Sequence, residues 1–294
     1  MNGFSASEAA LEGFRLTRER PGAIAAWSGL YAFGMAIIAF IMVTSLGDEA
    51  IAIARKGQLS AADIDAIAGR LAQSAPAFVL ILVLAVALMS ILTAGIYRLV
   101  LRPEEKGFAH LRLGGDELRL TAVNLVLFGV GMVCLLAGFI AATAVEQAAP
   151  GMAAVAAGVV GALTIWVGVR LSMVTPMTFA ARRITIAPAW EMTRGAFWPL
   201  LGMIVLAVIF YVMIWLLITI IGIAIINLSG GQQAMTDVSA MGPMTLIATM
   251  VTVVMQLLLS VLQVVMIYAP FAVAYQQLHG DAPANPLRNH VQAD

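Results

Sequence analysis

Six polar side chains recur at helical spacing in the apolar stretch 244–268, where they could hold or pass a polar group inside a membrane. They are separated by four, three, four, four and three residues, so all lie on one face of a helix. The six are Thr245, Thr249, Thr252, Gln256, Ser260 and Gln263. Because glutamine is costly in hydrocarbon, this face should turn into a helix bundle and form hydrogen bonds, with Ser90, Thr93 and Asn124 as candidate partners. The face either packs helices together or lines a substrate path or headgroup groove.

Four arginines could contact the phosphates of lipid headgroups. Arg170 lies within the apolar stretch 152–176, and an arginine inside a span is by default a functional hypothesis. It lies near the end of its stretch, however, where the side chain can reach the headgroups while its stem stays in the apolar layer. This position favours a structural anchoring role. The alternative is phosphate or headgroup contact, shared with Arg98, Arg182 and Arg183.

The sequence lacks the patterns that catalysis or ion coupling would require. No Asp or Glu lies within an apolar stretch, and the three histidines lie outside them. Ser90 and Ser260 therefore have no histidine or lysine beside them at membrane depth to act as a base. Cys134 is the only cysteine, which excludes an intrachain disulfide and a thiolate metal cluster. We expect no enzymatic activity, no cofactor and no metal site.

The elements that position these residues are six apolar stretches in a chain that is 62% hydrophobic and only 11% charged. A bilayer-spanning helix needs about 20 residues, and each stretch is long enough. The predicted spans are 22–46, 76–100, 120–142, 152–176, 197–228 and 242–276. They predict an all-α integral membrane bundle of six transmembrane helices, arranged as three hairpins within a membrane domain at 21–278.

The distribution of positive charge predicts the orientation of these spans. With the N-terminus inside, 13 of the 16 Lys and Arg residues lie on the inner side and three on the outer side. Positive residues accumulate in cytoplasmic loops, so we expect both termini to be cytoplasmic in a bacterial inner membrane. The formal net charge is zero, which gives no general attraction to nucleic acid.

Three segments outside the spans carry further predictions. Residues 1–20 should form a cytoplasmic amphipathic segment, with a helix at 5–19 that starts at a capping box of Ser5 and Glu8. Its apolar face should contain Ala10, Leu11 and Phe14 and lie on the membrane surface, unless the helix is simply solvated. A second amphipathic stretch should rest on the outer surface, and the tail at 279–294 should be disordered. The outer stretch is marked by Ile64, Ile67, Ala68 and Leu71.

One block resembles a known family. The run Arg170-Leu-Ser-Met-Val-Thr-Pro176, then Ala189-Trp-Glu-Met-Thr-Arg-Gly195, with Trp198 and Gly202 beyond, resembles the membrane domain of some bacterial glycerophosphodiester phosphodiesterases and related six-span inner-membrane proteins. In those enzymes a separate catalytic domain follows the membrane part, and we expect it to be absent here. The resemblance therefore implies a membrane fold without phosphodiesterase activity, and it carries over no catalytic residue.

These observations favour a non-enzymatic inner-membrane protein that organises or responds to lipids or partner proteins. Its expected partners are membrane lipids and a possible protein within the membrane. The alternative is a passive transporter or lipid-moving protein that uses the polar face of the sixth span.

Overall fold

The computed structural model describes residues 5–54, 60, 65, 68–70, 72–105, 107–149, 151–229 and 242–280, and every regular element in those ranges is a helix. Six helical segments there are long and apolar enough to cross a membrane, which confirms the predicted fold class. The outer stretch around Ile64, Ile67 and Leu71 and the tail beyond Gly280 lie outside the described residues. The six segments are α2 (Pro21–Ala54, apolar through Ser45), α4 (Ala75–Leu101), α5 (Gly115–Ala148), α6 (Ala153–Leu171) with α7 (Val174–Ala181), α9 (Phe197–Leu228) and α11 (Pro243–His279).

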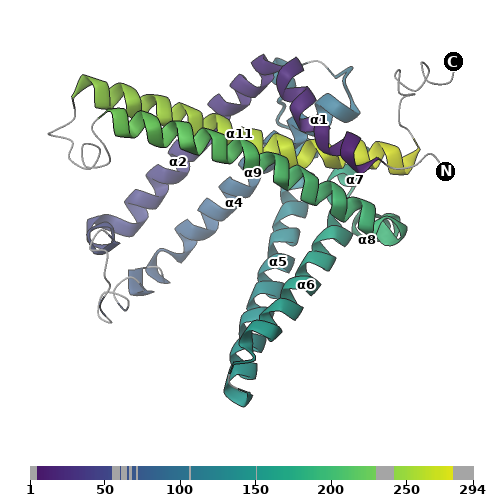
Figure 1. The fold of residues 1–294 in the computed structure, drawn as a ribbon, viewed down its shortest axis with the longest axis horizontal. Coiled ribbons are helices and arrows are strands. Elements are labelled where there is room, and N and C mark those ends of the chain that lie inside the picture. Colours follow the sequence, from purple (N-terminus) through teal and green to yellow (C-terminus); the bar gives the residue numbers. More distant parts are fainter. Residues whose placement is uncertain are drawn as a thin grey trace.

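The long helices pair as three hairpins, α2 with α4, α5 with α6 and α9 with α11 (Figure 1). The hairpins meet at one end and diverge at the other (Figure 1). Buried residues concentrate where they meet, at 88–99 of α4, 117–123 of α5 and 259–275 of α11. The diverging halves expose many large apolar side chains, as helices in contact with lipid do. We call the meeting end the junction; it comprises α1 (Ala6–Glu19), η1 (Phe108–His110), α7, α8 (Ile186–Met192), η2 (Thr193–Gly195) and the adjoining ends of the long helices.

Hydrogen bonds from large buried side chains hold the hairpins together at the junction. The indole N–H of Trp27 on α2 donates to the carbonyl oxygen of Ala109 in η1, at 2.8 Å. The hydroxyl groups of Tyr97 on α4 and Thr175 on α7 share a hydrogen bond of 2.7 Å. These bonds satisfy polar groups that would otherwise be buried without partners, so they fix where the first two hairpins meet.

The fourth span bends before it ends. The α6 helix stops at Leu171 and α7 starts at Val174, so the span continues to Ala181, beyond the predicted end at residue 176. Pro176 lies in the first turn of α7, where its missing N–H costs no helical hydrogen bond. The Ser172 hydroxyl donates to the carbonyl oxygen of Val169 at 2.7 Å and satisfies part of the open end of α6.

The α1 helix packs into the protein, mainly against α11 and α9. Its start is as predicted, because the Ser5 hydroxyl accepts a hydrogen bond from the Glu8 N–H at 3.4 Å. The contact includes only part of the predicted apolar face, because Ala10 is buried and Leu11 remains 49% exposed. The buried face uses small residues that allow close approach to α11, together with one leucine and one glutamate. These residues are Ala9, Ala10, Glu12, Gly13 and Leu16.

Candidate functional site

Three of the four hydroxyl groups on the polar face of α11 donate within their own helix, whereas that of Thr245 donates to the carbonyl oxygen of Ser229 at the end of α9, at 3.0 Å. Thr249 donates to the carbonyl oxygen of Thr245, and Thr252 donates to that of Ala248, each at 2.8 Å. Ser260 donates to the carbonyl oxygen of Gln256 at the same distance. These three side chains therefore donate no hydrogen bond to a neighbouring span.

The two glutamines of this face do not reach the predicted partners on α4 and α5. Gln263 accepts a hydrogen bond of 3.3 Å from the Tyr211 hydroxyl on α9, so its neighbour is the other helix of the same hairpin. The side-chain amide of Gln256 has no hydrogen-bond partner among the described residues. Both glutamines are exposed, so the expectation that they turn into the bundle is wrong, because the stripe follows one edge of the α9–α11 hairpin.

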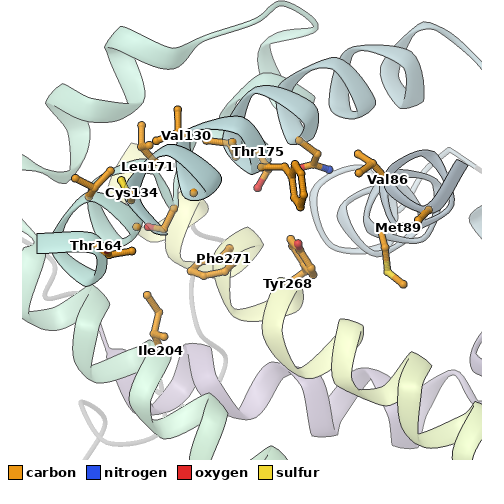
Figure 2. A pocket seen from close by; sticks show the side chains of 18 of the residues that line it. Val86, Met89, Val130, Cys134, Thr164, Leu171, Thr175, Ile204, Tyr268 and Phe271 are labelled. Carbon is orange, nitrogen blue, oxygen red and sulfur yellow. The ribbon is translucent and has the colours of Figure 1, made fainter. Parts of the chain in front are cut away.

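A cavity of about 590 Å³ lies where the three hairpins begin to separate (Figure 2). Gly131 of α5 and Gly168 of α6 line it, and a Cβ atom added at either position would meet nothing within 4 Å. These two glycines therefore leave open space between the helices. The remaining wall is mainly apolar and includes Val86, Met89, Leu127, Phe128, Cys134, Leu171, Ile204 and Phe271.

The cavity contains a few neutral polar groups, and none of the described residues that line it is charged. The Asn124 amide donates to the Ser90 hydroxyl at 2.9 Å, so these two predicted partners of the α11 face bond to each other instead. The Tyr268 hydroxyl lines the cavity and has no hydrogen-bond partner among the described residues (Figure 2). One amide and one phenol thus remain open to a bound molecule.

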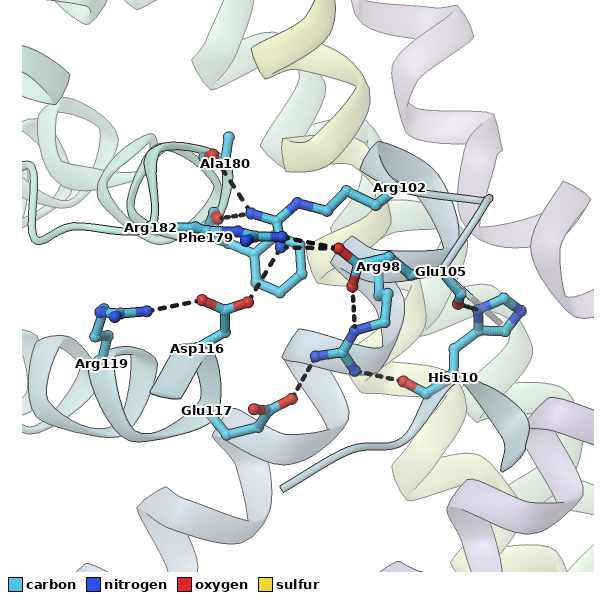
Figure 3. Close-up of polar contacts among 10 residues, drawn as sticks. All are labelled: Arg98, Arg102, Glu105, His110, Asp116, Glu117, Arg119, Phe179, Ala180 and Arg182. Carbon is cyan, nitrogen blue, oxygen red and sulfur yellow. Dashed lines mark hydrogen bonds and ion pairs between the residues drawn. The ribbon is translucent and has the colours of Figure 1, made fainter. Parts of the chain in front are cut away.

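Arg98 was predicted to contact headgroups, but it is buried in the junction and only 3% exposed. Its guanidinium pairs with the Glu117 carboxylate of α5 and donates to the carbonyl oxygen of His110 (Figure 3). Glu105 lies 3.4 Å from its Nε atom. Glu117 is itself 4% exposed, so the two charges compensate each other inside the protein.

A second arginine extends this network across the junction. Arg102 pairs with Asp116 at 3.1 Å, donates to the carbonyl oxygen of Phe179 at 2.6 Å and lies over the Phe179 ring at 4.5 Å (Figure 3). Arg182, a predicted headgroup contact, pairs with Glu105 at 3.1 Å. The network joins α4, α5 and α7. Carboxylates near the ends of the spans thus pair with arginines that we expected to contact lipid headgroups.

Arg170 also lies inside the junction, at 6% exposure, so it does not extend into the solvent. Its guanidinium stacks on the Trp190 ring of α8 at 4.6 Å, and Trp190 packs edge-on against Trp166 at 5.4 Å. The Thr193 hydroxyl donates to the carbonyl oxygen of Arg170 at 3.0 Å. The block that carried the family resemblance therefore folds back on itself and joins α6 to α8 and η2.

Among the described residues outside the membrane spans, one group has a shifted pKa. Burial raises the pKa of the Glu12 carboxyl, and the ion pair with Arg15 at 2.7 Å opposes that shift only in part. The described residues contain no group of three or more His, Cys, Asp and Glu side chains able to hold a metal ion.

No family model matches the chain, and no curated protein or solved structure matches it either. The resemblance to the phosphodiesterase membrane domain therefore stays a prediction. The site must be interpreted from its own geometry.

Proposed function

We propose that this chain is a lipid-binding protein of the bacterial inner membrane, which holds a membrane amphiphile in the cavity between its three hairpins. The observation that carries this proposal is the cavity itself, about 590 Å³ in volume and without a charged lining residue among those described. Ligand sites usually have volumes of about 300–1,000 Å³, with apolar walls and a few polar groups. The apolar part of an amphiphile would contact the leucine and phenylalanine side chains, and a neutral polar group would bond to Asn124 or Tyr268.

A binding role is favoured over catalysis by the chemistry of the cavity wall. Cys134, Ser172 and Thr175 carry its potential nucleophiles, but no histidine, lysine or carboxylate among the described lining residues could activate them. The alternative of a passive path along α11 receives less support, because three of the four hydroxyl groups of that face donate to their own helix.

Filling the cavity tests this proposal directly. Gly131→Phe places a ring in the open space, whereas Gly129→Phe places the same ring on the same helix outside the cavity wall. After mild detergent purification, native mass spectrometry should show bound lipid on the wild type and on Gly129→Phe. Gly131→Phe should retain roughly tenfold less, because the ligand loses its space. Equal lipid retention in the two variants, with both folded, would refute a ligand in this cavity.

We further propose that the junction lies on the cytoplasmic side of the membrane. Ser5 caps the start of α1 and Gly280 caps the end of α11, and both lie at the junction. Most Lys and Arg residues of the sequence are on the same side, as expected for the cytoplasmic face. Reporter domains fused after His290 should therefore be cytoplasmic, and reporters inserted at 143–151 or 229–241 should be external. An external reporter after His290 would reverse the proposed orientation.

A further inference from the structure

A second cavity, of about 550 Å³, lies within the junction and differs in chemistry from the first. Thr175 of α7 lines the first cavity, whereas Met177 and Ala180 of the same helix line the second, so α7 stands between them. Arg102, Arg183, Thr185, Gln276 and His279 contribute polar groups to the second cavity, and no carboxylate is found among its described lining residues.

The guanidinium of Arg183 is free to bind an anion in this cavity, whereas the neighbouring arginines are paired. Arg102 is held by Asp116 and by the carbonyl oxygen of Phe179, and Arg182 is held by Glu105. Arg183 is exposed and has neither an ion pair nor a hydrogen bond with any described residue. Because none of the paired carboxylates lines the cavity, Arg183 presents an uncompensated guanidinium at its wall.

Several polar groups of the wall are held in place before any ligand binds. The Gln276 amide donates to the carbonyl oxygen of Val100 at 3.2 Å, which ties α11 to α4. The His279 ring stacks on Tyr275 with 5.3 Å between ring centroids. Thr185 is buried, and its N–H donates to the Thr178 hydroxyl at 3.3 Å. Groups fixed in this way lose little conformational entropy when they bind a ligand.

We propose that this second cavity binds a phosphate-bearing anion. Guanidinium groups form strong, directional hydrogen bonds with phosphate, and no lining carboxylate competes for them here. The volume exceeds that of a phosphate group alone, so the ligand would be a phosphate ester, either a lipid headgroup or a soluble molecule. The site is independent of the apolar cavity, because α7 separates the two.

Two measurements on the full chain distinguish the two sources of phosphate. In detergent, inorganic phosphate should raise the melting temperature more than chloride does at equal ionic strength if a free phosphate can enter. In nanodiscs, native mass spectrometry should show retained phosphatidic acid in preference to phosphatidylcholine if the source is a lipid headgroup. A positive result in either measurement supports the proposal and identifies the source, and a negative result in both overturns it.

Paired variants then assign the binding to this cavity. Arg183→Gln should weaken the positive response roughly tenfold, because one charge-assisted contact is lost. Arg112→Gln removes the same charge from an exposed position outside the cavity and should change it by less than about twofold. Ala181→Glu adds a carboxylate to the wall and should also abolish binding, whereas Ala187→Glu adds one outside it. Equal responses within both pairs would overturn the assignment. Gly131→Phe should leave the phosphate response unchanged, so this test does not depend on lipid in the first cavity.

Discussion

Replacing Glu117 with leucine should lower the free energy of unfolding by about 3–5 kcal/mol, the usual cost of leaving one charge of a buried pair uncompensated. Arg98 would remain in the junction at 3% exposure, with Glu105 as the nearest carboxylate at 3.4 Å from its Nε atom. The double variant Arg98→Met with Glu117→Leu should recover most of this loss, because no buried charge remains. Denaturation in detergent micelles measures the free energy of unfolding of the wild type and of both variants.

A matched surface pair provides the control for this result. Arg119 pairs with Asp116 at 2.9 Å, but the Arg119 side chain is 41% exposed. Arg119→Gln should therefore cost less than about 1 kcal/mol. If Glu117→Leu costs no more than Arg119→Gln, the buried pair does not hold α4 to α5, and packing alone must do so.

The fold was largely predictable because membrane spans depend on local composition. The fifth predicted span, 197–228, coincides with α9, and each hairpin pairs two long helices that follow each other in the sequence. The lengths of the third and fourth spans were underestimated. The α5 helix begins at polar residues before its apolar core, and α7 continues the fourth span after a break. Hydrophobicity marks the part of a helix within lipid and does not mark where the helix ends.

The sites were less predictable, because they depend on which helices meet. Helical spacing placed the α11 polar residues on one face, but it could not show that this face runs beside α9. Arg98 and Glu117 are separated by 19 residues and a loop, and neither position alone indicates that the other is its partner. Both cavities are spaces between elements. In the sequence, a glycine such as Gly131 is equally compatible with close helix packing and with the wall of a cavity. Only the relative positions of the helices distinguish these cases.

The N-terminal helix shows that a hydrophobic pattern does not identify which face packs against the protein. Leu11 and Phe14 are large apolar residues of α1, yet the docked face contains Ala9, Gly13 and Leu16. Close contact between helices favours small residues, since they allow the backbones to approach. Phe14 still contributes at the edge, where its ring meets Phe210 at 5.5 Å between centroids.

Substituting Gly13 with leucine should therefore detach α1 from α11. A Cβ atom at this position would lie 2.7 Å from the Met266 sulfur and 2.9 Å from its Cα atom, and the latter belongs to the helix backbone. Overpacking of this kind costs about 1–3 kcal/mol. A loss of about 1–2 kcal/mol would make the undocked state roughly 5–30-fold more populated.

Limited trypsin digestion detects this change, because α1 contains Arg15 and Arg18 and an undocked helix is cleaved from its open state. Gly22→Leu is the matched control, since a Cβ atom there meets nothing within 4 Å and leucine is an equally good helix former in both variants. Faster cleavage only in Gly13→Leu indicates that close backbone contact holds α1 in place. If both variants are cleaved at the wild-type rate, Gly13 does not set the docking of α1, and α11 must be able to move away from the added side chain.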